Sequence, residues 1–204
     1  MSATNRREAI IEGAEAFFAE QGFKGSTREL CKGLGISNAL LFKYFANKDE
    51  LLEEVYRRHF LRRWKASWLT ELEDRSKPLP DRLRQFYREY SEIVSDPNWM
   101  RLNLLSGMAD ISLTRRYITE SVGPIFCAIA NERSAILSPG APAAYENIDD
   151  LPEDELELVW HLHSTIIYYY IRKDIFGVRV SEDVDVAIDI AVAGFCATLP
   201  EAVA

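Results

Sequence analysis

The apolar positions in the first 55 residues recur with the period of short α-helices. An apolar stripe runs along residues 10–18, with glutamates on the other sides, and it predicts a first helix that ends at Gly22. The S-x-x-E sequence from Ser26 to Glu29 is a capping box, so a second helix is expected to begin near Thr27. The N-terminal segment therefore opens with two short helices joined by a tight loop.

A turn and two further helices are predicted directly after this pair. Gly35 supplies the turn, and Ser37 is a good N-cap for a third helix whose inward residues are Leu40, Leu41 and Phe45. Asn47 then caps a fourth helix that begins at Lys48. Two short helices joined by a glycine turn are typical of the helix-turn-helix motif.

The rest of the chain shows no strand alternation and no repeat, and it is expected to be helical almost throughout. Prolines at 78 and 80 interrupt the helical pattern, and a further break is expected at Gly123–Pro124. The stretch 138–152 is expected to be a loop. The helices predicted after the first 50 residues are 50–72, 81–95, 97–109, 112–137, 153–176 and 181–199.

The outward face of the third helix differs from an ordinary solvated surface. It consists of Asn38, Ala39, Phe42, Lys43 and Tyr44, and it therefore carries two aromatic rings and one charge. Such a face suits insertion into a DNA major groove, where amide and ammonium groups reach base edges and a methyl group can meet thymine.

The segment from about Arg6 to about Val55 resembles the N-terminal domain of the TetR/AcrR family of bacterial transcriptional regulators. The resemblance rests on "FAEQGF", on "GISNALLFKYF" as recognition helix and on "NKDELL" at the start of the next helix. Two departures are the loop from Gly22 to Ser26, which is one residue shorter than is common, and Phe42, where the family often has Tyr. The remaining 150 or so residues resemble the family in architecture only.

The resemblance implies an all-α fold with an N-terminal three-helix helix-turn-helix DNA-binding domain at 1–50 and a helical ligand-binding and dimerisation domain at 51–204. Lys43 and Asn38 are the best candidates for base contacts, and Lys48 gains from the helix N-terminus near a phosphate. The residues expected to contact DNA are Thr27, Arg28, Ser37, Asn38, Ala39, Phe42, Lys43, Tyr44 and Lys48.

Charge is divided unevenly along the chain. The net charge of the 204 residues is −8, but residues 1–65 hold 12 lysines and arginines against 9 acidic residues. The basic end is thus the one with the helix-turn-helix pattern. Because this excess is small, DNA affinity is expected to depend also on dimerisation and on helix N-termini.

The family usually has a ligand cavity between its DNA-binding domain and its dimer interface, and the middle of this chain is rich in large apolar residues with a few polar ones. That composition fits a site for a hydrophobic or aromatic molecule, although most such residues are simply core. The candidates are Phe86, Tyr90, Trp99, Asn103, Leu104, Met108, Tyr117, Phe126, His163 and Ile167. His161 and His163 point about 200° apart on a helix, so one metal ion is not expected to bind both.

The last two helices are expected to form the interface of a homodimer, as the resemblance implies; an intramolecular core is the alternative. Small residues at helical spacing allow close approach, and larger ones supply area. The candidates are Trp160, Ile171, Val184, Ala187, Ile188, Ala191, Gly194 and Phe195. A two-fold dimer would place two recognition helices about one DNA turn apart on a pseudo-palindrome.

These features predict a ligand-responsive DNA-binding regulator, which the family tendency makes a repressor. The alternative is a helical interaction module or orphan regulator that has lost ligand response or specific DNA binding. No phosphate loop, nucleophile elbow or metal-ligand spacing indicates an enzyme, a metal or a cofactor. The polar start, the lack of a long apolar run and three scattered cysteines predict a cytoplasmic protein without a membrane span. Plain packing is favoured over redox activity for these cysteines.

Overall fold

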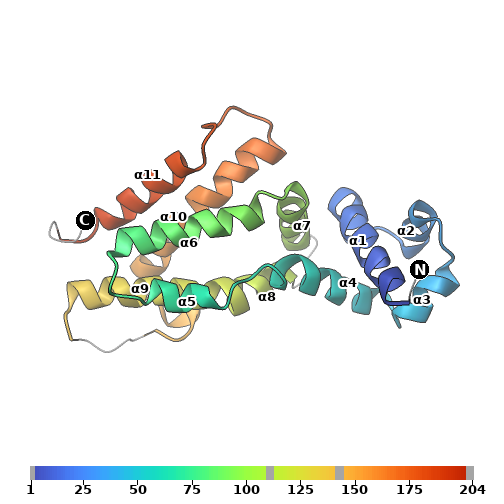
Figure 1. Ribbon diagram of the computed structural model, residues 1–204, viewed down its shortest axis with the longest axis horizontal. Helices are drawn as coiled ribbons and strands as arrows, with labels where there is room; N and C mark the ends of the chain where they lie inside the picture. Colours follow the sequence, from blue (N-terminus) through green and yellow to red (C-terminus); the bar gives the residue numbers. More distant parts are fainter. Residues whose placement is uncertain (1–2, 109–112, 141–144, 201–204) are drawn as a thin grey trace. The chain divides into compact units, whose positions relative to one another are not determined.

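The computed structural model describes residues 3–108, 113–140 and 145–200, and the part of the chain that it describes is helical without a strand (Figure 1). The α-helices are α1 (Ala3–Gln21), α2 (Thr27–Leu34), α3 (Asn38–Tyr44), α4 (Lys48–Tyr56), α5 (Ser67–Leu72), α6 (Leu79–Val94), α7 (Pro97–Met108), α8 (Leu113–Tyr117), α9 (Gly123–Leu137), α10 (Glu153–Tyr170) and α11 (Asp185–Cys196). Three π-helical turns, η1 (Arg57–Leu61), η2 (Ile118–Val122) and η4 (Ile171–Ile175), extend α4, α8 and α10, and η3 (Ile148–Asp150) is a 3₁₀ turn.

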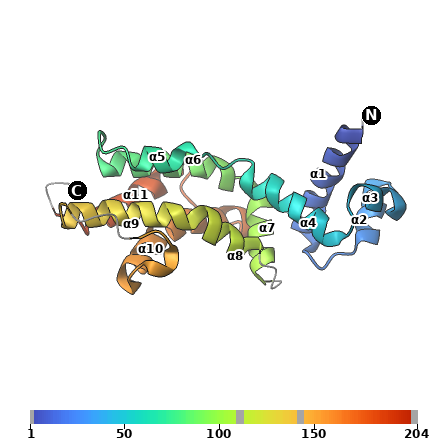
Figure 2. The same ribbon diagram turned by 90° about the horizontal axis from the view of Figure 1, so that it is seen from below.

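The chain folds into two compact units. The N-terminal unit comprises Met1–Trp64 and Pro97–Arg115, and the C-terminal unit comprises Lys65–Asp96 and Arg116–Ala204. In the N-terminal unit, α1 packs against α2, α4 and α7. In the C-terminal unit, α10 packs against α6, α9 and α11, and α5 packs against α6 and α9 (Figure 1 and Figure 2).

The single helix predicted over residues 50–72 is wrong. Helical structure from Lys48 ends after the π turn at Leu61, and α5 begins at Ser67. The two pieces belong to different compact units, so each follows the packing of its own core. The buried Trp68 of α5 packs edge-on against Phe86 of α6, at 5.2 Å between ring centroids.

The break predicted at Gly123–Pro124 is instead a continuous helical path. The π turn at Ile118–Val122 leads directly into α9, and the proline lies in the first turn of that helix. Proline is tolerated there because a first-turn N–H has no partner within the helix. Part of the predicted loop at 138–152 lies outside the described residues, as does Ala109 at the end of the short helix predicted before it.

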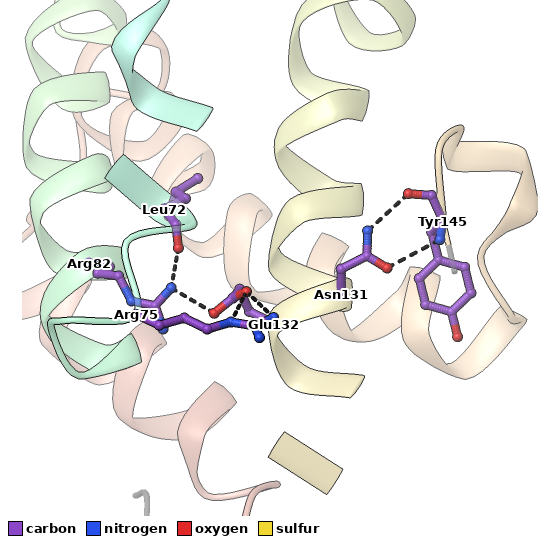
Figure 3. Close-up of polar contacts among 6 residues, drawn as sticks. All are labelled: Leu72, Arg75, Arg82, Asn131, Glu132 and Tyr145. Atoms are coloured by element: carbon purple, nitrogen blue, oxygen red, sulfur yellow. Dashed lines mark hydrogen bonds and ion pairs between the residues drawn. The ribbon is translucent and has the colours of Figure 1, made fainter. Parts of the chain in front are cut away.

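A buried ion pair fixes the start of α6 against α9 in the C-terminal unit (Figure 3). The Arg82 guanidinium donates to Glu132 Oε2 at 2.7 Å and also to the carbonyl oxygen of Leu72. Arg75 donates to the other oxygen of the same carboxylate at 2.9 Å. On the next residue of α9, the Asn131 side chain exchanges two hydrogen bonds with the backbone of Tyr145 (Figure 3). These contacts bind the connections before α6 and after α9 to the helical core.

Candidate nucleic-acid interface

The turn before α3 is built by three local devices, all of which were predicted. Ser26 and Glu29 form the capping box of α2, and hydrogen bonds from Ser26 hold the pKa of the Glu29 carboxyl below its ordinary value. Gly35 adopts a left-handed conformation with φ of 64°, which favours glycine. The Ser37 hydroxyl accepts from the Leu40 N–H at 3.1 Å and so caps α3.

Two buried anchors hold α3 in place and decide which of its faces is exposed. Leu41 and Phe45 are each 1% exposed, and the Arg7 guanidinium lies 5.0 Å from the centre of the Phe45 ring. At the far end, the Asn47 side chain accepts from the Glu50 N–H at 2.8 Å and caps α4. Helix α3 is thus fixed by its own N-cap and by its buried side chains, and the helix that follows it has a cap of its own.

The exposed face of α3 consists of Asn38, Ala39, Phe42 and Lys43. Phe42 keeps 46% of its surface exposed. Ser37 and Arg28 are also exposed, whereas Tyr44 and Thr27 are half-buried. The predicted DNA-contacting residues other than Lys48 are therefore all exposed or half-buried.

Lys48 has a role that the sequence did not indicate. Its ammonium group donates to the carbonyl oxygens of Phe23 at 2.5 Å and Gly25 at 2.8 Å, and it lies 5.6 Å from the centre of the Phe18 ring. These contacts tie α4 to the short loop between α1 and α2. Two of the three N–H donors of the Lys48 ammonium are thus used within the domain, which leaves one donor for a phosphate.

A second polar network was also missed, and it lies between α1 and the helix that follows α4. The Arg58 guanidinium lies 2.7 Å from Glu8 and 3.4 Å from Glu15, and the buried His59 Nδ1 lies 2.7 Å from Glu15. The spacing of Glu8, Glu12 and Glu15 by four and three residues is the signal that could have revealed it. Arg58 is therefore engaged within the N-terminal unit.

These features define a helix-turn-helix domain: α2 and α3 are joined by a capped turn, and α3 is anchored with one face exposed. In this motif the second helix of the pair enters the major groove, and here that helix is α3. Residues 10–55 match the model for bacterial regulatory proteins of the tetR family. On this evidence residues 10–55 form a helix-turn-helix domain similar to that of the tetR family of regulators.

Two relatives share this domain, and one solved structure shares the overall fold. The chain is 39% identical over 54 residues to the HTH-type transcriptional repressor KstR2 of Mycobacterium tuberculosis, and 43% identical over 49 residues to the HTH-type transcriptional repressor AcnR of Corynebacterium glutamicum. These matches cover 26% and 24% of this chain, and only 27% and 26% of the two relatives. A crystal structure of a TetR-family transcriptional regulator from Mesorhizobium loti matches 97% of this chain and 98% of its own, with a TM-score of 0.63 and 18% identity. That likeness shows the fold beyond the helix-turn-helix.

The predicted ligand-binding residues divide between the two units. Trp99, Asn103, Leu104 and Met108 belong to α7 of the N-terminal unit, where Trp99 is buried and Met108 is exposed. The remaining six belong to the C-terminal unit, where all but the half-buried Ile167 are buried; they are Phe86, Tyr90, Tyr117, Phe126, His163 and Ile167.

His163 lies at the centre of the aromatic part of the C-terminal unit. Its ring centroid is 5.2 Å from those of both Tyr90 and Phe126, and the Tyr117 hydroxyl donates to the Tyr90 hydroxyl at 3.1 Å. Burial lowers the pKa of His163 to about 3, so its imidazole is neutral near pH 7. Among the described residues, its Nδ1 has no hydrogen-bond partner.

This burial predicts a pH dependence of stability. A histidine whose pKa falls from about 6.5 to about 3 on folding contributes nothing unfavourable above pH 6.5, and it destabilises the fold as pH falls below that value. We expect His163→Leu to reduce the loss of unfolding free energy between pH 7 and pH 5 by about 2 kcal/mol. Urea unfolding at the two pH values measures it, with the exposed His161→Gln as matched control. An unchanged pH dependence in His163→Leu would contradict the burial of a neutral imidazole.

The predicted dimer residues also fall into two groups. Ile188, Ala191 and Phe195 are buried within the C-terminal unit itself. Trp160, Ile171, Val184 and Ala187 are half-buried, and Gly194 is exposed with nothing within 4 Å of a Cβ built on it. The exposed apolar residues of α11 that the sequence analysis did not select are Val186 and Ile190, and Ile190 keeps 66% of its surface exposed.

Two negative expectations concern metals and membranes. In the residues that the structure describes, no three His, Cys, Asp or Glu side chains gather as metal ligands would. No helix within the same residues combines the length and the apolar composition that crossing a membrane requires.

The cysteines 31, 127 and 196 are all buried free thiols, and burial raises the pKa of each.

Proposed function

We propose that this protein is a DNA-binding transcriptional regulator, a repressor that binds a pseudo-palindromic operator as a homodimer. The observation that carries this proposal is the exposed face of α3, held by caps and buried anchors within a domain that matches the TetR family. The relatives KstR2 and AcnR are both transcriptional repressors, which supports repression over activation. A protein with this role works in the cytoplasm, where bacterial DNA lies.

Two observations support a homodimer. A pseudo-palindromic operator has two half-sites and needs two recognition helices, and α11 has an exposed apolar face. Val186, Ile190 and Gly194 recur every four residues along this helix, so they lie on one side of it. A row of exposed apolar and small residues beside the half-buried Ala187 is an unusual solvent face and suits a second copy of the chain. Two-fold pairing through α10 and α11 would supply the second recognition helix.

Selection of bound DNA from a random-sequence duplex pool tests this function. We expect the purified protein to enrich two inverted half-sites whose centres lie about one helical turn apart. Enrichment of a single half-site would contradict the dimeric operator. No enrichment at all would contradict sequence-specific binding and favour an interaction module.

Lys43 provides a direct test of base reading. It is the one lysine on the exposed face of α3, and we expect Lys43→Ala to weaken binding to the selected operator by about 1–3 kcal/mol while changing binding to random DNA much less. Fluorescence anisotropy on both DNAs measures the difference. Lys77→Ala, at an exposed lysine of the C-terminal unit, is the matched control. Equal weakening on both DNAs would show that Lys43 contacts only phosphate.

We further propose that a small hydrophobic or aromatic molecule releases the protein from DNA by binding near His163. The neutral imidazole offers a hydrogen-bonding nitrogen within an aromatic environment, which suits a ligand with one polar group. Release requires only that the ligand prefers the conformation that does not bind DNA. A coupling of about 1–3 kcal/mol gives roughly 5- to 150-fold weaker DNA binding. A compound screen that follows loss of anisotropy tests this, and binding of a compound without release would contradict it.

A further inference from the structure

The exposed face of α3 has an apolar centre with polar edges. At about 100° per residue, Phe42 and Ala39 lie in the middle of this face, and Asn38 and Lys43 lie at its two edges. All four residues are exposed, while Leu41 on the opposite side is 1% exposed. The part of the helix that points most directly away from the domain is therefore a phenyl ring beside a methyl group.

The anchoring of α3 makes this arrangement a fixed property of the surface. Leu41 and Phe45 are buried, and Ser37 caps the start of the helix, so the helix cannot rotate to hide Phe42 without breaking its core contacts. The ring has no hydroxyl and cannot donate to a phosphate or to a base. Exposure of 46% of a phenylalanine to water is unfavourable unless a partner covers it.

The floor of the major groove offers one kind of apolar group. Guanine, cytosine and adenine carry no methyl group there, whereas thymine presents its C5-methyl group beside the O4 acceptor. A helix with an apolar centre and polar edges can place its ring on such a methyl while the edges reach hydrogen-bonding atoms of flanking bases. The match between the ring and the methyl group requires no charge and no hydrogen bond.

We propose that Phe42, with Ala39 beside it, is a specificity-determining residue that selects thymine in each half-site through the C5-methyl group. This inference rests on the proposed function, because it needs a DNA operator. Lys43 and Asn38 then read or position the neighbouring bases, and Phe42 sets which position must be thymine. With that methyl present the ring makes an apolar contact in the groove, and without it the ring faces hydrogen-bonding base edges.

Replacement of thymine by deoxyuridine in the selected operator tests the proposal, because this change removes the methyl group alone. We expect deoxyuridine at one position in each half-site to weaken binding of the full-length protein about 3- to 10-fold. Phe42→Ala should bind the thymine operator more weakly and should lose most of the difference between thymine and deoxyuridine. Lys43→Ala is the matched control, since it should weaken binding but keep that difference.

The outcomes separate the inference from the function on which it rests. An enriched operator in which no thymine responds to deoxyuridine would overturn the role of Phe42 and leave the regulator intact. A deoxyuridine effect that persists in Phe42→Ala would also overturn it, because another residue would then contact the methyl. If the selection enriched no sequence at all, both the role of Phe42 and the proposed DNA-binding function would be overturned. Circular dichroism and thermal unfolding of the two variants check that the protein keeps its helical fold, as is expected for changes at exposed positions.

Discussion

Ile190→Glu is expected to convert the proposed homodimer into a monomer and to weaken operator binding by about 10²- to 10⁴-fold. The side chain is 66% exposed on α11, so a glutamate is compatible with the single chain. In a two-fold interface the two glutamates would be brought close together in an apolar contact, and burying like charges is strongly unfavourable. Loss of the second recognition helix removes the gain that comes from binding two half-sites at once.

Mass by sedimentation or light scattering at micromolar protein measures the first effect, and anisotropy measures the second. Gly194→Leu should act in the same direction, because a side chain there meets open space in the single chain and would collide only with a partner helix. Leu137→Glu, at an exposed position on α9, is the control and should remain dimeric. A dimer that survives both α11 substitutions would place the interface elsewhere.

Glu132→Ala is expected to lower the free energy of unfolding by about 3–5 kcal/mol. The Glu132 and Arg82 side chains form an ion pair in which the residues are 5% and 6% exposed. Removal of the carboxylate leaves the Arg82 guanidinium buried without its counter-charge. The free-energy cost of that unpaired charge is larger than the contribution of a single ordinary hydrogen bond. Urea unfolding followed by tryptophan fluorescence measures the change.

Two further variants separate burial of a charge from loss of a surface contact. Arg75 also binds Glu132, but its side chain is 65% exposed, so Arg75→Ala should cost no more than about 1 kcal/mol. Replacement of both buried partners by leucine should recover a large part of the stability lost in Glu132→Ala, because no unpaired charge remains. Equal destabilisation by Arg75→Ala and Glu132→Ala would contradict this account of the ion pair.

The sequence predicted the helix-turn-helix well because its determinants are local. A capping box, a left-handed glycine and two further caps each act within four residues of their own position, and the structure confirms all of them. The inward positions Leu41 and Phe45 follow from helical periodicity and are also confirmed. A local signal of this kind can be read without knowing what lies beside the helix.

The C-terminal unit could be predicted only in outline, because its packing joins residues far apart in the chain. The sequence of α11 is apolar on nearly every side, so periodicity could not tell whether Ile188 or Ile190 faces the chain's own core. The structure buries Ile188 completely and leaves Ile190 exposed. The pairing of Arg82 with Glu132 across 50 residues likewise leaves no local signal. For Lys48, the two carbonyl partners belong to a loop more than 20 residues away.

The central claim is sequence-specific DNA binding by the exposed face of α3, and fluorescence anisotropy tests it most directly. The protein is titrated onto labelled DNA from its own upstream intergenic region, beside a scrambled duplex, across a salt series. We expect tight binding to the upstream DNA that exceeds binding to the scrambled duplex at every salt concentration, with both affinities falling as salt rises. Weak and equal binding to the two DNAs, repeated with the product of the random-pool selection, would contradict the claim and indicate a helix-turn-helix that no longer reads sequence.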